Sequence, residues 1–207
     1  MEIIYGTSNK NKVISMKKIL KENNVDANIY TLKDIDFNQE IIEDGKTFEE
    51  NSEIKANEIK KFCDANNIKD KIIITDDAGL CIDKLDGEPG VYSARYAGEH
   101  GNSEANRKKL LKNLEGKSDR SAYFKTVIVF VDETGDEYVA KGILKGTIST
   151  EERGENGFGY DKIFIPENMD KTLAEIGAEE KNKFSHRKRA LEDLKNILGD
   201  RYDSSSC

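Results

Sequence analysis

Residues 72–80 read Ile72-Ile73-Ile74-Thr75-Asp76-Asp77-Ala78-Gly79-Leu80, and this stretch decides the fold. Three consecutive β-branched residues predict a short strand that is covered on both faces, as in a parallel sheet. We expect the strand to deliver Asp76 and Asp77 to its C-terminal end, facing a crevice. The two carboxylates are therefore candidates for chemistry, although adjacent aspartates can also cap the turn after a strand.

Strand and helix patterns alternate on the N-terminal side of this stretch. Strands are predicted near residues 2–7 and 28–32, and apolar residues recur between them at the spacing of one helical face. Thr47 and Glu50 have the spacing of a helix capping box, and the helix that they begin should end around residues 66–67. Such alternation is typical of an α/β fold.

The C-terminal side adds an antiparallel pattern. A turn containing Pro89 precedes a predicted helix over residues 103–114, capped by Asn102 or Ser103. Two β-rich stretches, 122–131 and 138–148, are joined through Asp132-Glu133-Thr134-Gly135-Asp136, which is good hairpin chemistry. The sequence therefore predicts an α/β fold built on a mixed sheet with flanking helices, rather than a bundle or a sandwich.

The last third of the chain contains a glycine-rich loop and a helix. The loop, residues 154–160, leads into a predicted strand at 162–165. A final helix should begin near Ser185, and its buried face is predicted to consist of Ala190, Leu191, Leu194 and Ile197. Residues 203–207 have the composition of a frayed tail.

Length and composition limit the class of protein. A chain of 207 residues with 36% hydrophobic content fits one domain, residues 1–207, which can contain two lobes. The net charge of −7 argues against nucleic acid or an anionic membrane as a general partner. We find no signal peptide and no membrane-length apolar run, and Cys63, Cys81 and Cys207 lack metal-ligand spacing. A reducing, cytoplasmic location is the expectation, and the cysteines are interpreted as structural or incidental.

The first candidate site is Thr7-Ser8-Asn9-Lys10-Asn11-Lys12, between a predicted strand and helix. Small polar side chains, free backbone amides and two lysines at a helix start favour a phosphate group. The glycines of a Walker loop are missing. The alternative is an ordinary polar turn between a strand and a helix.

The second candidate joins Asp76-Asp77 to an earlier acidic turn, Glu43-Asp44-Gly45. Mg²⁺ prefers a few carboxylate oxygens together with waters and substrate phosphates, so two distant loops could share one ion. A carboxylate beside the ion could also orient or deprotonate an attacking water.

Two further candidates lie near the C-terminus. Gly157-Phe158-Gly159-Tyr160-Asp161 places an aromatic ring between glycines, where a flat base could stack, although such a ring is commonly a packing residue. Lys181 and then Ser185-His186-Arg187 could converge on a hydrogen-bond acceptor at a helix start. A solvated basic helix start is the alternative.

Taken in order, these motifs resemble the inosine triphosphate pyrophosphatase family over nearly the whole chain. The resemblance rests on Thr7-Ser8-Asn9 with Lys12, Thr47-Phe48-Glu49-Glu50-Asn51, Lys55-Ala56, Asp76-Asp77-Ala78-Gly79-Leu80, Pro89-Gly90-Val91-Tyr92-Ser93-Ala94-Arg95-Tyr96, Gly157-Phe158-Gly159-Tyr160-Asp161 and Ser185-His186-Arg187. It implies an elongated α/β fold with a nucleotide cleft between two lobes, usually as a homodimer. It also implies Mg²⁺-dependent cleavage of non-standard purine nucleoside triphosphates, such as ITP, dITP and XTP, to the monophosphate and pyrophosphate.

The resemblance also implies roles for single residues. Glu43 and Asp77 would bind the metal, and Asp77 would accept a proton. Substrate contacts are implied for Thr7, Ser8, Asn9, Lys10, Asn11, Lys12, Lys55, Ala78, Phe158, Gly159, Tyr160, Asp161, Lys181, His186 and Arg187. Three positions depart from the family pattern, which commonly has Gly at Ser8, Ser at Ala78 and Pro at Lys162. At Ala78 a side-chain hydroxyl is lost, so any contact there must come from the backbone.

Two other functions compete with this interpretation. An aspartate-based phosphatase would use Asp76 or Asp77 as a phosphorylated nucleophile, but these two aspartates are adjacent and do not have the usual Asp-x-Asp spacing. A nucleotide-sensing or RNA-binding module would use the basic residues 181–189. Net acidity argues against RNA, because affinity for RNA rests largely on cationic surface.

Overall fold

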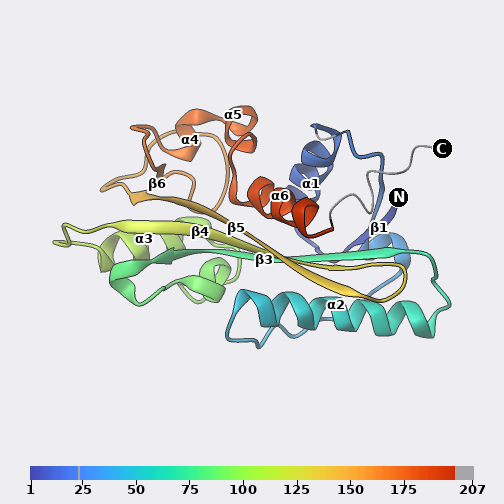
Figure 1. Ribbon diagram of the computed structural model, residues 1–207. Helices are drawn as coiled ribbons and strands as arrows, with labels where there is room; N and C mark the ends of the chain where they lie inside the picture. Colours follow the sequence, from blue (N-terminus) through green and yellow to red (C-terminus); the bar gives the residue numbers. More distant parts are fainter. Residues whose placement is uncertain (23, 199–207) are drawn as a thin grey trace. The chain divides into compact units, whose positions relative to one another are not determined.

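The computed structural model describes residues 1–22 and 24–198, so the predicted frayed tail at 203–207 and Cys207 lie outside the described residues (Figure 1). The strands are β1 (Glu2–Tyr5), β2 (Asn28–Thr31), β3 (Ile72–Ile82), β4 (Ser121–Val131), β5 (Glu137–Ile148) and β6 (Phe164–Pro166). The α-helices are α1 (Lys10–Glu22), α2 (Phe48–Ala65), α3 (Ser103–Asn113), α4 (Leu173–Ile176), α5 (Ala178–Asn182) and α6 (His186–Leu198). Short 3₁₀ turns lie at Leu32–Ile35, Asp83–Leu85 and Gly90–Arg95.

Over the described residues the strands form one sheet in the order β2-β1-β3-β4-β5-β6. Strand β1 pairs in parallel with both β2 and β3, whereas β5 and β6 are antiparallel. The predicted mixed sheet with flanking helices is confirmed. The predicted hairpin is also present, because the Asp132 N–H donates to the Asp136 carbonyl, 3.0 Å away, between β4 and β5.

The chain divides into two compact units. Of the described residues, unit 1 comprises those in the ranges 1–77, 126–142 and 187–198, and unit 2 comprises residues 78–125 and 143–186. The predictions of one domain over 1–207 and of a nucleotide cleft stay predictions.

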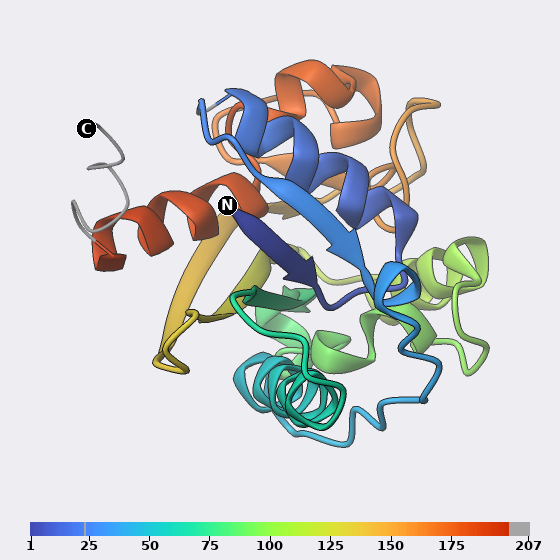
Figure 2. The same cartoon turned by 90° about the vertical axis from the view of Figure 1, so that its right-hand side faces the viewer.

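Unit 1 is a three-layered arrangement around its part of the sheet. Helices α1 and α6 lie on one face of the strands and α2 lies on the other (Figure 2). Alternation along the strands produces this division. Ile72 and Ile74 pack in the cluster with α1 and α6, whereas Ile73 packs with α2.

Unit 2 has its own hydrophobic core. Leu80 and Ile82 of β3 are fully buried there, with Leu110 of α3 and Phe164 of β6. Asn102 caps α3 by accepting a hydrogen bond from the Ala105 N–H at 3.0 Å, as one of the two predicted alternatives requires.

Strand β3 corrects the first prediction. It runs to Ile82, so Asp76 and Asp77 lie inside a strand and not at its C-terminal end. The strand continues because the apolar residues after the aspartates enter the core of unit 2. Its parallel partner β1 nevertheless ends at Tyr5, which is paired with Ile74. Asp76 and Asp77 therefore lie two and three residues beyond the last parallel pair.

Two other predictions are corrected near the C-terminus. Ile197 is 44% exposed, because it lies in the last turn of α6, beyond the hydrophobic cluster that receives Ala190 and Leu194. The strand predicted at 162–165 begins instead at Phe164, since residues 160–163 form a turn in which the Ile163 N–H donates to the Tyr160 carbonyl.

Candidate active site

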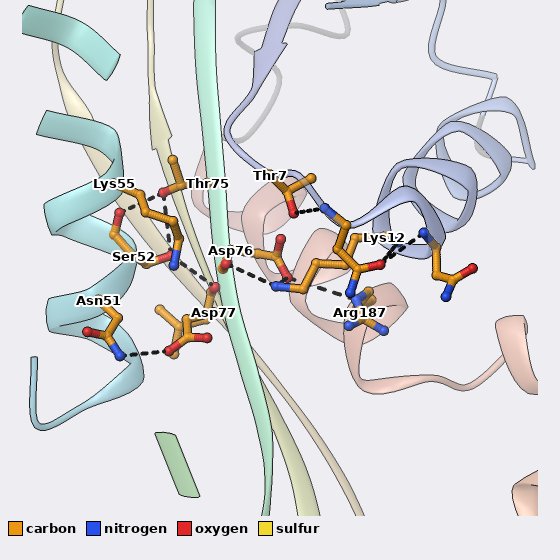
Figure 3. A network of polar contacts seen from close by, with 12 residues as sticks. Thr7, Lys12, Asn51, Ser52, Lys55, Thr75, Asp76, Asp77 and Arg187 are labelled. Carbon is orange, nitrogen blue, oxygen red and sulfur yellow. Dashed lines mark hydrogen bonds and ion pairs between the residues drawn. The ribbon is translucent and has the colours of Figure 1, made fainter. Parts of the chain in front are cut away.

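Adjacent aspartates of β3 point to opposite faces of the strand, as the two-residue period of a strand requires (Figure 3). Asp76 faces Lys12 and Arg187, and Asp77 faces Asn51 of α2. Two residues of the same type that are neighbours in sequence therefore have separate surroundings within unit 1.

Asp76 is buried, with an exposed fraction of 1%, and several polar groups surround it. The Tyr5 hydroxyl donates to Asp76 Oδ1 at 2.6 Å, and Lys12 Nζ lies 2.9 Å from Oδ2. Lys12 Nζ also donates to the Asp76 backbone carbonyl at 3.2 Å, and Arg187 Nε lies 3.9 Å from Oδ2. Asp76 thus supports two predicted substrate-binding cations, and it does not cap a turn.

These partners decide the ionisation of Asp76. Burial by itself would raise the pKa of this carboxyl, because water stabilises the charged form. The charges of Lys12 and Arg187, together with the Tyr5 hydrogen bond, outweigh burial and hold the pKa of Asp76 below its ordinary value. Asp76 is therefore a fixed anion whose charge is balanced locally.

Asp77 is linked to the acidic turn through Asn51. The Asn51 side-chain amide donates to Asp77 Oδ2 at 3.1 Å, and its oxygen accepts the Gly45 N–H at 2.9 Å. A side chain at position 45 would not fit, because its Cβ would lie 2.7 Å from the Asn51 oxygen. Gly45 therefore lets the turn that contains Glu43 approach α2 closely.

Helix α2 also brings Lys55, one turn after Asn51, to this site. The Lys55 ammonium forms a very close ion pair with Glu43. Thr47 caps the helix by accepting the Glu50 N–H at 3.1 Å, and Glu50 in turn accepts from the Lys46 N–H. Of the predicted capping box, the Thr47 cap is present, but Glu50 accepts from Lys46 and not from the Thr47 N–H. The cap sets where Asn51 and Lys55 lie along the helix.

The ionisation of Asp77 differs from that of Asp76. Burial raises the pKa of the Asp77 carboxyl, and Glu43 acts in the same direction. The opposing charges of Lys55 and Lys12 and the hydrogen bond from Asn51 do not compensate for burial. The positive charge near Asp77 therefore stabilises its ionised form less than burial destabilises it.

The donor set on this face fits Mg²⁺, the metal that the resemblance implies. Mg²⁺ is usually held by only one or two carboxylates, with waters and substrate phosphates completing its shell. Glu43 and Asp77 supply two carboxylates, and the raised pKa of Asp77 indicates a place where a cation would be stabilised. Among the residues described, no group of three or more His, Cys, Asp or Glu side chains could hold a metal by itself.

The loop Thr7–Lys12 begins α1 in unit 1. The Asn9 side-chain oxygen accepts the N–H groups of Asn11 at 3.0 Å and Lys12 at 3.4 Å, as a helix cap does. The prediction of free amides was therefore wrong for these two groups. Residues 8–11 are exposed, whereas the Lys12 side chain extends to Asp76 and is only 15% exposed.

The predicted base-binding loop, residues 157–161, lies in unit 2 and is closed by its own side chains. Asp161 Oδ2 accepts the Phe158 N–H at 2.9 Å and lies 2.5 Å from Lys181 Nζ. Gly157 has φ +80°, and a Cβ there would collide with the Asp161 carboxylate. Glycine at position 157 is therefore needed for Asp161 to close the loop.

The aromatic residues of this loop divide into an exposed and a buried one. Phe158 is 39% exposed, and Lys181 Nζ lies 4.9 Å from the centre of its ring. Tyr160 is buried and donates its hydroxyl to the Ser93 carbonyl at 2.8 Å, and burial raises its pKa. Phe158 therefore has the accessibility that a stacking surface needs, whereas Tyr160 packs in the core.

The last predicted motif is divided between the two units. His186 belongs to unit 2, where it is buried and stacks on Phe124 with ring centroids 5.0 Å apart. Arg187 belongs to unit 1 and faces Asp76. Ala78 in unit 2 is half-buried, and the substrate contact predicted for it stays a prediction.

Three residues that organise these sites have no role in the predictions made from sequence. Tyr5 was assigned only to a strand, yet its hydroxyl contacts Asp76. Asn51 is part of a motif that supports the family resemblance, but no role is predicted for it, although it contacts Asp77. Arg107 is predicted only as part of a helix, although it contacts the 157–161 loop. The signal for Asn51 was its spacing of four residues from Lys55, which places both side chains on one helical face.

Comparisons with known proteins identify a family. The model of the Ham1 family matches residues 3–197. A relative from Clostridium perfringens, named dITP/XTP pyrophosphatase, is 47% identical over 199 residues, which cover 95% of this chain and 97% of the relative. A protein of the same name from Campylobacter jejuni is 44% identical over 200 residues, which cover 96% and 97% of the two chains. The structure of the Staphylococcus aureus Ham1 protein superposes with a TM-score of 0.83 at 37% identity, over 96% of this chain and 98% of that one.

Proposed function

The chain belongs to the Ham1 family, and on that premise we propose that it hydrolyses non-standard purine nucleoside triphosphates. Its substrates are dITP, XTP and ITP, and its products are the nucleoside monophosphate and pyrophosphate. The names of its relatives support this reaction, since several are called dITP/XTP pyrophosphatase. Removal of such nucleotides clears deaminated purines from the nucleotide pool.

The observation that carries the proposal is the arrangement around Asp77. The half-buried Asp77 carboxyl, whose pKa is raised, is held by Asn51 beside a second carboxylate, Glu43, and an ammonium group, Lys55. Buried titratable groups with shifted pKa values in such clusters are typical of catalytic sites. This cluster combines a potential proton acceptor, two metal ligands and a cation for phosphate.

In the proposed mechanism Glu43 and Asp77 would hold Mg²⁺. The bound ion would neutralise phosphate charge and increase the acidity of water. Asp77 orients a water molecule and accepts its proton as the water oxygen attacks the α-phosphorus. The bond from that phosphorus to the bridging oxygen breaks, and pyrophosphate leaves with the electron pair. Lys12, Lys55 and the loop from Thr7 to Asn11 bind the phosphates, so catalysis rests mainly on position and electrostatics.

Residues of unit 2 are proposed to recognise the purine. The exposed ring of Phe158 offers a stacking surface, and Lys181 and His186 are the proposed hydrogen-bond donors of this unit. The resemblance implies Arg187, which belongs to unit 1, as a further donor. Hypoxanthine and xanthine have an acceptor oxygen at position six, where adenine has a donor amine. A donor that faces a donor leaves both unpaired, at a cost of about 1–3 kcal/mol per group, which favours the oxo bases over adenine.

The test is a measurement of pyrophosphate release from ITP, XTP, GTP and ATP, with and without Mg²⁺. We expect rapid, Mg²⁺-dependent release from ITP and XTP and much slower release from ATP. Orthophosphate as the first product would contradict the proposed cleavage point. The homodimer that the resemblance implies is a separate prediction, which light scattering of the purified protein tests.

The structure gives little support to the competing functions. A phosphorylated aspartate must be reachable, yet Asp76 is 1% exposed and is paired with Lys12 and Tyr5. An acyl-phosphate trapped at Asp77 would nevertheless establish the phosphatase mechanism. Strong, salt-sensitive RNA binding without nucleotide turnover would establish the RNA-binding module. None of the helices within the described ranges has the length and apolarity needed to cross a membrane.

A further inference from the structure

The guanidinium group of Arg107, on α3, makes contacts to two different segments of unit 2. Its Nε and Nη2 donate to the two carboxylate oxygens of Glu152, at 2.9 and 3.1 Å. Its Nη1 donates to the backbone carbonyl of Gly159 at 2.8 Å. All three nitrogens of one planar group are therefore used, and the third contact is made within the loop 157–161.

The pair with Glu152 fixes the orientation of this group. A carboxylate that accepts two parallel hydrogen bonds holds the guanidinium plane in a defined direction. The Arg107 side chain is only 9% exposed, whereas that of Glu152 is 31% exposed. Arg107 is thus held by protein contacts and directs Nη1 at the Gly159 carbonyl.

The Gly159 carbonyl lies between the exposed Phe158 and the buried Tyr160. Gly159 has φ +62°, a backbone conformation that favours glycine, and a Cβ at this position would meet open space. The peptide group on its C-terminal side leads into Tyr160, which is anchored to Ser93, and on its N-terminal side the chain continues to Phe158. The hydrogen bond from Arg107 therefore restrains the backbone between the buried tyrosine and the exposed phenylalanine.

We propose that Arg107 is a positioning residue for purine recognition. It acts by holding the Gly159 carbonyl, which fixes the position of the Phe158 ring. The inference rests on the proposed function, because it assumes that Phe158 stacks on the base. Arg107 takes no part in phosphate binding or bond cleavage. Its loss therefore affects binding of the base and leaves the chemical step intact.

The experiment compares Arg107→Lys with a matched control, Arg153→Lys. Lysine keeps the charge but cannot contact Glu152 at two points and Gly159 at the same time. Arg153 also belongs to unit 2, donates to a backbone carbonyl, that of Asp170, and lies 3.5 Å from a carboxylate oxygen of Glu175, but these contacts are outside the loop 157–161. Glu152→Gln keeps Arg107 and weakens only its orientation.

We measure KM and kcat for ITP, inhibition by inorganic tripolyphosphate, and amide hydrogen exchange of Phe158 and Asp161. In Arg107→Lys we expect KM to rise about tenfold, the loss of roughly one hydrogen bond to a charged group, with kcat and tripolyphosphate inhibition unchanged. Exchange at the two amides should accelerate. Glu152→Gln should give a smaller change in the same direction, and Arg153→Lys should change neither KM nor exchange at these amides.

Two results would overturn the proposal. One is an unchanged KM for ITP and unchanged exchange in Arg107→Lys. The other is an equal weakening of ITP and tripolyphosphate binding, which would mean that Arg107 supports the fold in general. If the unaltered protein does not hydrolyse ITP, the proposed function fails, whereas the exchange experiment still decides whether Arg107 holds the loop.

Discussion

Asp76 and Asp77 are neighbours in one strand, but they have opposite electrostatic surroundings. On the face toward α1 and α6, Asp76 is balanced by Lys12, Arg187 and Tyr5, and its pKa is lowered. On the face toward α2, burial raises the pKa of Asp77, because the positive charge near it is too small to offset the loss of water around the carboxylate. The Asp76 carboxylate is thus fixed as an anion by its partners, whereas the Asp77 carboxyl is the one at which the proposed metal and water would be held.

The largest expected effect comes from Asp77→Asn. Removal of a proton acceptor and metal ligand should lower kcat for ITP about a thousandfold, within the range that general bases contribute. Pyrophosphate release under saturating Mg²⁺ is the measurement, and circular dichroism checks that the variant is folded. A well-folded variant that keeps most of its turnover would show that Asp77 is not the catalytic carboxylate.

Asp76→Asn should act mainly on stability. The change removes the anion from Lys12 and Arg187, and breaking one side of a buried ion pair commonly costs about 3–5 kcal/mol. Urea denaturation should therefore show a much lower free energy of unfolding than for Asp77→Asn. Equal stability of the two variants would mean that the two faces of β3 do not differ as proposed.

The smallest expected effect is the pH dependence of Asp77→Asn without metal. A carboxyl with a raised folded pKa destabilises the folded protein fully above that pKa, and this penalty disappears as the pH falls to the unfolded value near 3.8. Asp77→Asn should therefore be more stable than the unaltered protein at neutral pH, and the gain should vanish below pH about 4. Thermal unfolding in EDTA across this range is the measurement. A gain that grows toward acid pH would contradict the sign of the shift.

The sequence predicted those parts of the molecule in which local pattern and packing agree. The helix predicted to end around residues 66–67 ends at Ala65, and the hairpin predicted after Val131 is present. The extent of β3 could not be predicted in this way, because two adjacent charges interrupt its apolar pattern. Their placement inside the strand depends on contacts with Tyr5, Lys12 and Asn51, which are distant in sequence.

The candidate site shows the same limit. The motifs predict the charged and glycine-rich segments of the site, but they do not predict the side chains that connect these segments. Asn51 and Arg107 act through backbone groups of Gly45 and Gly159, and a contact to a carbonyl or an amide leaves no pattern in a single sequence. The roles implied for individual substrate-binding residues stay predictions until variants are measured.

The alternation of β3 also constrains how this gene can change. Insertion or deletion of one residue between Ile74 and Asp77 would turn every following side chain to the other face. Asp77 would then meet Lys12 and Arg187, and a different side chain would face Asn51. Substitutions in this segment can be compensated one by one, but a change in its length would exchange both environments in one step. The spacing from the isoleucines to the aspartates should therefore tolerate no insertion or deletion during evolution or in a mutational library.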